Sequence, residues 1–138
     1  MINLRGVLAQ DVMAWWPKVE HWITQALERG PRLYNTADVL SEILARDMQL
    51  WLACEGEEPI GAVVTSIITF PRRTVLLIGP IGGIGVRRWI KPMDDLIRDY
   101  AAANGCDIQL SEGRPGWDRL VGNQWRVTAT QYVREITR

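Results

Sequence analysis

The chain has few of the residue types that most often build reactive centres. Its 138 residues include one histidine and two cysteines. The chain therefore has few of the side chains that a zinc site or a catalytic cysteine–histidine pair requires. Cys54 and Cys106 lie in separate apolar runs, without the spacing of metal ligands. We therefore expect two buried free thiols and no metal site.

Net charge is also missing, since sixteen basic and sixteen acidic side chains cancel. A balanced chain gives no general attraction to nucleic acid or to an anionic membrane. The basic pairs Arg72-Arg73 and Arg87-Arg88 are isolated, so we interpret them as solvated turns rather than a nucleic-acid contact. No apolar stretch approaches the roughly twenty residues of a spanning helix. No basic region precedes an apolar run at the start, so we expect neither a membrane span nor a signal peptide.

Tryptophan is what the chain has in excess. Most of these rings suit the core of a domain, and we favour this interpretation. The alternative is that some lie on a contact surface, where the large amphipathic indole ring is favoured. The seven are Trp15, Trp16, Trp22, Trp51, Trp89, Trp117 and Trp125.

The first third of the chain is typical of a strand followed by two helices. Ile2–Val7 is a short candidate strand. Apolar residues recur at helical spacing from Val12 to Glu28, and we expect Pro17 to kink or restart that helix. Asn35 or Thr36 then caps a second helix.

The middle third predicts three strands in succession. The runs Gln49–Cys54, Ile60–Phe70 and Thr74–Ile78 are apolar or rich in β-branched residues, and polar turns separate them. Short connections of this kind favour an antiparallel meander.

The last third begins with the glycine-rich segment 79–85. A helix starts near Lys91-Pro92, since proline suits the first helical position, and ends at Gly105. Cys106–Leu110 alternates apolar and polar residues, as expected of a half-buried strand parallel to its predecessor. The order is completed by a short helix or turn within 113–122 and a final strand over 124–137.

This order predicts an α/β fold in a single domain, residues 1–138. The sheet is mixed, with an antiparallel meander plus a parallel strand pair, and helices cover both faces. Over essentially the whole chain the order resembles the GNAT superfamily of acyl-coenzyme A transferases. The start is similar too, since Ile2–Arg5 is a strand carrying an arginine and Asp11 is an acidic helix cap.

The resemblance implies a coenzyme A site after the fourth strand, in a Q/R-x-x-G-x-G/A loop whose N–H groups bind pyrophosphate. Gly83-Ile84-Gly85 matches the glycines, but Pro80 stands at the Q/R position and brings no donor. No helix start follows at once, so we favour a flexible loop or edge strand. A pantetheine cleft is implied between the fourth and fifth strands, and either Trp89 or Trp117 is large enough to fill it. If coenzyme A binds, the expected contacts are Gly82, Gly83 and Gly85.

The resemblance also implies a base for the acceptor amine and a tyrosine for the leaving thiolate. That tyrosine normally lies in the short helix after the fifth strand, and the stretch 117–122 has none. We interpret His21 as a partly buried helical side chain and Tyr100 as a core residue. Glu112 is a lone carboxylate after the fifth strand. We therefore assign no catalytic residue.

A closer resemblance is to GNAT-like proteins encoded among the virion and DNA-packaging genes of tailed bacteriophages. The most specific match is Gly113–Arg119, a G-R-x-G-W-x-R run in place of the tyrosine segment. In short-tailed phages such proteins are associated with the internal or ejected part of the virion. The other matching features are Asp47–Trp51, Ala62–Thr65, Gly82-Gly83 with Trp89, and Gly105-Cys106.

The run at 113–117 is typical of a rigid turn, because glycine and proline fix its backbone and Trp117 anchors it. Arg114 and Arg119 either pair with Glu112 or Asp118 or reach a carboxylate or phosphate of a partner. We favour internal pairing. The candidates for partner contact are Arg114, Trp117 and Arg119.

Two functions stay open. The favoured one is a non-enzymatic structural or assembly component of a tailed bacteriophage particle, in the internal virion, the tail or the head–tail region. It implies a fold degenerate at the acetyl-coenzyme A site, no cofactor, and other virion proteins as partners in a multi-copy assembly. It also implies a location in the virion, and in the host cytoplasm during assembly. The alternative is an active N-acyltransferase that uses acetyl-coenzyme A.

Overall fold

The computed structural model describes residues 1–112, 117–122 and 124–138, without the side chains of Trp117 and Asp118. Its elements confirm the predicted α/β class. In chain order they are β1 (Ile2–Val7), the 3-10 turn η1 (Ala9–Asp11), α1 (Val12–Arg29), α2 (Thr36–Leu44), β2 (Met48–Glu55), β3 (Glu58–Thr69), β4 (Thr74–Gly83), the 3-10 turn η2 (Val86–Arg88), α3 (Ile90–Ala103), β5 (Ile108–Ser111) and α4 (Trp117–Val121).

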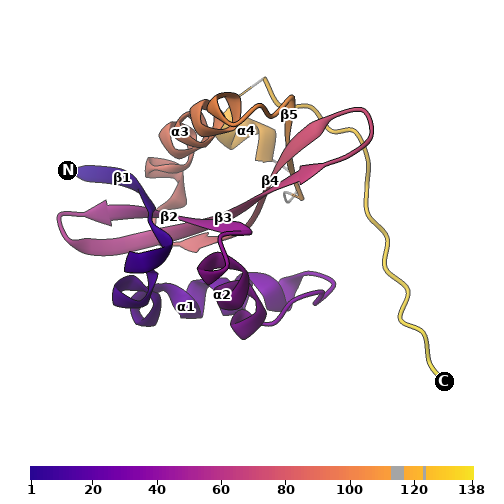
Figure 1. Cartoon of the computed structure of the whole chain (residues 1–138), viewed down its shortest axis with the longest axis horizontal. Helices are drawn as coiled ribbons and strands as arrows, with labels where there is room; N and C mark the ends of the chain where they lie inside the picture. Colours follow the sequence, from indigo (N-terminus) through magenta and orange to yellow (C-terminus); the bar gives the residue numbers. More distant parts are fainter. Residues whose placement is uncertain (113–116, 123) are drawn as a thin grey trace.

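One five-stranded sheet, in the order β1-β2-β3-β4-β5, forms the centre of the molecule. The first four strands pair antiparallel with their neighbours, and β5 pairs parallel with β4. This confirms the meander and the parallel pair. Figure 1 shows α1 and α2 on one face of the sheet and α3 with α4 on the other.

Local sequence explains how the two N-terminal helices begin and continue. The Asn35 side chain accepts a hydrogen bond from Asp38 N at 2.8 Å, and Asn35 N donates to the Asp38 carboxylate at 2.9 Å. This reciprocal capping box makes Asn35, rather than Thr36, the cap of α2. Pro17 lies inside α1, which continues through it as one helix, so the helix does not restart there.

Two apolar cores flank the sheet. The core under α1 and α2 contains Trp16 and Trp22, and the core under α3 contains Trp51 and Trp89. All four rings are buried, which confirms the core interpretation for them. Residues Leu50–Cys54 of β2 and Ala62–Val64 of β3 contribute alternately to the two cores, as the twofold period of a strand requires.

The two cysteines differ in burial. Cys54 is buried in β2, as expected, but Cys106 is only partly buried, at the turn between α3 and β5. Both thiols are free.

The predicted final strand is wrong for the described residues of the C-terminal segment. Residues 126–138 form no strand and are exposed. They run away from the body of the molecule (Figure 1). Alternation of apolar and polar residues is not enough for a strand, because a strand also needs a partner for its backbone groups. No helix in the described part of the chain has the length and apolar character to cross a membrane.

Candidate functional site

The two parallel strands pair only along the first half of β4. Pairing with β5 runs from Val75, opposite Ile108, to Ile78, opposite Ser111. Beyond Ile78, β4 continues to Gly83 with β3 as its only partner in the described residues. β5 ends at Ser111, so the half of β4 beyond Ile78 has no pairing with β5, at the place where the family resemblance implies an opening.

A β-bulge lies at the point where the pairing of β4 with β5 ends. Thr65 of β3 faces Ile78, and Val63 faces Ile81, so Gly79 and Pro80 together stand opposite one residue of β3. Such a bulge bends the strand and re-aims its backbone, which is why bulges are common beside binding sites. Because Pro80 has no N–H, it donates no hydrogen bond to the neighbouring strand and none to a ligand.

The glycine segment is strand for most of its length. Gly82 and Gly83 belong to β4, and Ile84 N still donates to the carbonyl of Ile60 at 2.7 Å. Gly85 has φ of 59° and begins η2 directly. The left-handed backbone that glycine permits turns the chain straight from strand into this short 3-10 turn, while the α-helix itself begins at Ile90, close to the start predicted near Lys91-Pro92.

The turn at η2 presents unused hydrogen-bond donors. Within the described residues, the backbone N–H groups of Gly85, Val86 and Arg87 donate to no acceptor. Arg88 pairs with Glu55 at 2.9 Å across the surface. Arg87 is exposed and forms no ion pair with any described residue. Adjacent N–H groups beside a free guanidinium are what an anion such as a phosphate requires.

The buried side chain of Trp89 packs under this turn, on its interior side. Its side chain is fully buried, and its indole Nε1 donates to the carbonyl of Ile84 at 3.0 Å. The ring packs against Gly61 and Gly83, which face each other across β3 and β4. The ring therefore lies on the β3–β4 pair and does not stand between β4 and β5. The side chain of Trp117, the other expected filler, lies outside the described residues.

A buried polar contact ties α3 to the C-terminal segment. Trp125 Nε1 donates to Asp94 Oδ2 at 2.9 Å, and Asp94 is only 6% exposed. Burial raises the pKa of the Asp94 carboxyl, and the Trp125 hydrogen bond opposes that shift. Asp94 Oδ1 and the amide Nε2 of Gln109 in β5 are buried without a hydrogen bond to any described residue. No local sequence pattern signals this contact, because Asp94 and Trp125 are 31 residues apart.

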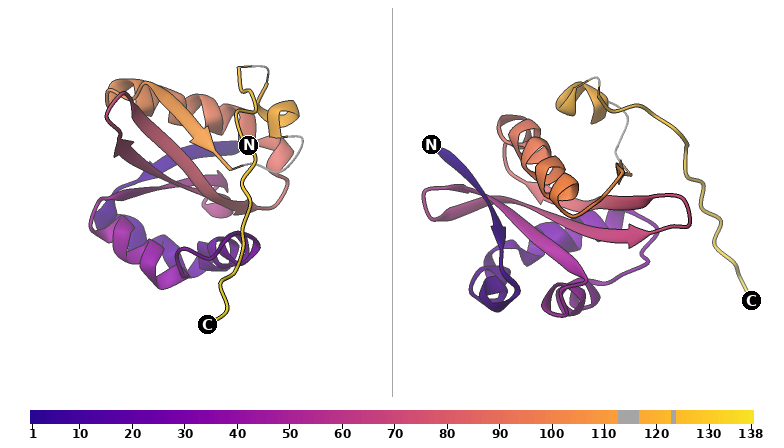
Figure 2. Two further views of the ribbon diagram at one scale, coloured as in Figure 1. Left: turned by 90° about the vertical axis from the view of Figure 1, so that its right-hand side faces the viewer. Right: turned by 45° about the horizontal axis from the view of Figure 1, so that its top comes forward.

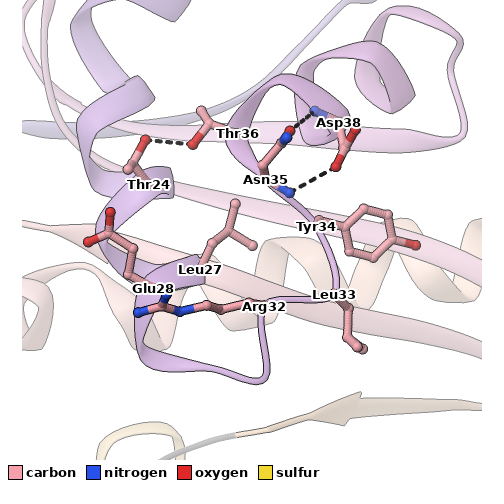
Figure 3. Close-up of a pocket in the computed structure, with 9 residues that line it drawn as sticks. All are labelled: Thr24, Leu27, Glu28, Arg32, Leu33, Tyr34, Asn35, Thr36 and Asp38. Atoms are coloured by element: carbon pink, nitrogen blue, oxygen red, sulfur yellow. Dashed lines mark hydrogen bonds between the residues drawn. The ribbon is translucent and has the colours of Figure 1, made fainter. Parts of the chain in front are cut away.

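A surface cavity of about 320 Å³ lies between α1 and α2 (Figure 3). Thr24 donates to the carbonyl of Glu20 at 3.0 Å, so Thr36 is the donor in the 2.6 Å contact between the two threonine hydroxyls. The charged side chains of the lining, Glu28, Asp38 and Arg32, give the cavity one excess negative charge. The full lining is Thr24, Leu27, Glu28, Arg32, Leu33, Tyr34, Asn35, Thr36 and Asp38.

The side chains considered for acid–base chemistry are scattered. His21 is exposed on α1, with its ring 4.5 Å from the Trp22 ring, so the prediction of partial burial is wrong. It lies opposite the buried stripe of that amphipathic helix. Tyr100 is partly buried, edge-on to Trp51 at 5.1 Å. Burial raises the pKa of the Cys54 thiol, which removes it as a nucleophile. Glu112 is exposed just after β5.

The candidates for partner contact are only partly described. Arg114 lies outside the described residues, as does the turn to which it was assigned. Trp117 begins α4, and Arg119 is exposed on that helix. Arg119 forms no ion pair with a described residue, including Glu112. No group of three potential metal ligands comes together in the described part of the chain.

Comparison with known proteins gives structural relatives only. No protein-family model matches the chain, and no curated protein sequence matches it. An aminoglycoside acetyltransferase, meta-AAC0020, from an uncultured soil metagenomic sample has a TM-score of 0.74 at 6% identity. That match covers 99% of this chain and 97% of the other.

Two further solved structures show the same likeness. The aminoglycoside N-acetyltransferase AAC(6')-Iy in complex with CoA has a TM-score of 0.67 at 14% identity, over 98% of this chain and 95% of the other. The ribosomal-protein-alanine N-acetyltransferase of Brucella melitensis biovar Abortus 2308 has a TM-score of 0.60 at 10% identity, over 96% and 100%. At these identities the likeness shows the fold, and the fold is that of the GNAT acetyltransferases.

Proposed function

We propose that the protein is an acyl-coenzyme A-dependent N-acyltransferase, with acetyl-coenzyme A as the donor. The observation that carries this proposal is the end of β4–β5 pairing at Ile78, with a bulge there and a donor-rich turn beyond it. The likeness to acetyltransferases supports it, although fold alone does not fix activity.

The donor would be held mainly by backbone. The N–H groups of Gly85, Val86 and Arg87, which donate to no described residue, suit a pyrophosphate, and the exposed Arg87 guanidinium adds positive charge. The pantetheine arm would run beside the part of β4 beyond Ile78, where pairing with β5 has ended. Pro80 offers no hydrogen-bond donor to the ligand. We therefore expect acetyl-coenzyme A to bind more weakly than it would to a loop with an arginine or glutamine at that position.

The acceptor would lie in the cavity between α1 and α2. α1 crosses β4 at Gly82, where a Cβ would come within 2.8 Å of the Cβ of Trp22. The cavity lining begins with Thr24, half a turn further along α1. Because Glu28 and Asp38 outweigh Arg32, the cavity favours a positively charged acceptor such as an alkylammonium group.

Catalysis would depend mainly on holding acetyl-coenzyme A and the acceptor amine in position to react. A carbon–nitrogen bond forms to the acyl carbon, the carbon–sulfur bond breaks, and the amine proton passes to water. The described residues supply neither a placed base nor a tyrosine in α4 for the thiolate. Holding the two reactants together still accelerates such a step. We expect slow transfer whose rate rises with pH, as the acceptor amine loses its proton.

The test is acetyl transfer to a panel of diamines, polyamines and an aminoglycoside, followed by mass spectrometry of the products between pH 7 and 9. Glu28→Lys should reduce transfer to these cations, since it reverses a charge in the cavity. Glu57→Lys, in the exposed turn between β2 and β3, is the matched control. Product formation no faster than without protein, for every amine and at every pH, would refute the proposal.

A structural role in a tailed phage particle is the second candidate. Pro80, the absence of tyrosine from α4 and the exposed apolar side chains of the C-terminal segment favour an interaction protein over an efficient enzyme. The similar structures named above are acetyltransferases and add nothing to this reading. Stoichiometric presence of the protein in purified particles would support it, and consistent absence would count against it.

A further inference from the structure

A second surface cavity, of about 360 Å³, lies at one end of the strand pair β1–β2, where β1 finishes and β2 begins. Its lining takes Ile43 from α2 and Tyr100 from α3. Figure 2 shows these two helices on opposite faces of the sheet in both views, so the cavity reaches round the end of the strand pair. Pockets of this volume hold small molecules. The full lining is Gly6, Val7, Leu8, Ala9, Gln10, Ile43, Arg46, Met48, Gln49, Leu50, Trp51 and Tyr100.

This cavity is separate from the two sites described above. The turn at η2 meets β2 at its other end, where Arg88 pairs with Glu55, the last residue of that strand. The cavity between α1 and α2 lies at the start of α2, whereas Ile43 and Arg46 bring the second cavity to the end of the same helix. No described residue lines both cavities.

Most of the lining is apolar. Ile43, Leu50 and Trp51 are buried, so the inner part of the cavity is formed by aliphatic and aromatic side chains. Tyr100 meets the Trp51 ring edge-on at 5.1 Å, a favourable arrangement that holds the two rings together. Leu8 also lines the cavity and is 64% exposed. These side chains would shield the apolar body of a ligand from water.

A chain of hydrogen bonds orients the amide of Gln49. The indole Nε1 of Trp51 can only donate, so Thr65 Oγ1 accepts from it at 2.9 Å. The hydroxyl hydrogen of Thr65 then goes to Gln49 Oε1 at 2.8 Å. This turns the amide oxygen towards Thr65 and leaves the two N–H groups of Gln49 Nε2 without an acceptor in the described residues. Gln49 therefore offers the cavity hydrogen-bond donors.

Arg46 is the one charged side chain in the lining that the described residues form. It is exposed and forms no ion pair with a described residue. Its backbone has φ of 68°, and its N–H donates to the carbonyl of Ile43 at 3.0 Å just after the end of α2. Glycine is the usual residue in this conformation at a helix end, so the arginine stands where the backbone favours glycine. Its guanidinium gives the cavity one positive charge.

We propose that this cavity binds a small amphipathic carboxylate, a monoanion with an apolar body. The carboxylate would accept hydrogen bonds from the Arg46 guanidinium and from Gln49 Nε2, and the apolar body would lie against Trp51 and Tyr100. A cation would find no opposite charge in this lining. An uncharged apolar molecule would leave both groups of donors unused.

Calorimetric titration of the full chain with octanoate tests the proposal, and octylammonium is the probe of equal length and opposite charge. We expect saturable binding of octanoate and none of octylammonium at the same concentrations. Arg46→Gly should weaken octanoate binding about tenfold or more, through loss of a charged hydrogen bond. Because glycine suits the left-handed backbone at this position, the variant should be at least as stable as the wild type in urea denaturation.

Arg32→Gly is the matched control. Arg32 also has a positive φ, of 57°, but it lines the cavity between α1 and α2, so this variant should bind octanoate as the wild type does. Gln49→Glu is an independent test of the same site. The glutamate still accepts from Thr65, but it places a negative charge beside the bound carboxylate, so octanoate binding should be lost. In the wild type, octanoate should shift the backbone NMR signals of residues 6–10 and 46–51 most.

Each contrary result overturns the proposal. No saturable binding at millimolar octanoate would mean that the cavity holds no such ligand. Equal binding of octanoate and octylammonium would mean that the cavity selects apolar molecules without regard to charge. Unchanged binding in Arg46→Gly or Gln49→Glu, or loss of binding in Arg32→Gly, would place the bound octanoate elsewhere. Acetyl transfer plays no part in these readouts, so the result is independent of the proposed enzymatic function.

Discussion

The indole ring of Trp89 lies directly over Gly61, so that a Cβ on residue 61 would overlap the ring carbons. This contact joins the start of α3 to the middle of the sheet. The same indole holds the carbonyl of Ile84, so the ring also fixes the turn that carries the free N–H groups. The absence of a side chain at position 61 is thus a condition for the geometry of the candidate donor site.

Gly61→Ala should lower the free energy of unfolding by about 1–3 kcal/mol, because the buried ring has no room to move away. Urea denaturation followed by tryptophan fluorescence measures this directly. Gly30→Ala is the control, because the nearest atom to its Cβ is Leu27 O at 3.9 Å. Equal stability of the two variants would show that the Trp89 ring is not fixed over β3.

Thr65→Val should also destabilise the protein. Trp51 Nε1 donates to Thr65 Oγ1 at 2.9 Å, and that hydroxyl donates to Gln49 at 2.8 Å. Valine has nearly the same shape but leaves the buried indole N–H without an acceptor, at a cost of about 1–3 kcal/mol. Thr65→Ser keeps the hydroxyl and should retain most of the stability. A valine variant as stable as the serine variant would contradict this hydrogen-bonded chain.

Asp94 predicts a pH dependence of stability. Burial raises its folded-state pKa above the ordinary value of 3.8, so the folded protein binds more protons than the unfolded chain. The Asp94 contribution to the free energy of unfolding therefore falls as pH rises from that ordinary value through the raised one.

Asp94→Asn tests this contribution. Its amide oxygen still accepts from Trp125 Nε1, while the buried charge is gone. The variant should lack this part of the pH dependence and gain stability relative to the wild type at neutral pH. The measurement is urea denaturation at a series of pH values. Parallel pH profiles for the two proteins would show that Asp94 does not titrate with a raised pKa.

Most of the fold was predictable from periodicity and turn residues. The capping residues at 35–38 and the alternating runs of the meander are local signals, and local hydrogen bonds and burial decide those elements. The absence of a strand from residues 126–138 was not predictable from the alternating pattern. Such a strand needs a neighbouring strand to pair with, and the pattern does not show whether one is present. The exposure of His21 was missed, although the helical period places it opposite the buried residues Val12, Val19 and Ile23 of α1.

The candidate site was predictable only in outline. Gly83 and Gly85 were recognisable as a motif, but the two positions require glycine for different physical reasons. Gly83 has φ of 151°, and a Cβ there would lie 2.5 Å from Ile60 O, so packing of β4 demands it. Gly85 turns the chain into η2. The end of β4–β5 pairing at Ile78 and the α1–α2 cavity depend on contacts distant in sequence, which no local pattern encodes.

Calorimetric titration of the full chain with acetyl-coenzyme A tests the central claim most directly. Arg87→Glu is the informative variant, because Gly83 substitutions would also disturb β4. Arg72→Glu, an equally exposed reversal in the turn between β3 and β4, is the control. We expect saturable binding that weakens about tenfold or more in Arg87→Glu, since a charged hydrogen bond contributes about 1.5–3 kcal/mol, and is unchanged in Arg72→Glu. No binding at millimolar ligand, or equal binding by both variants, would contradict a donor site at this turn.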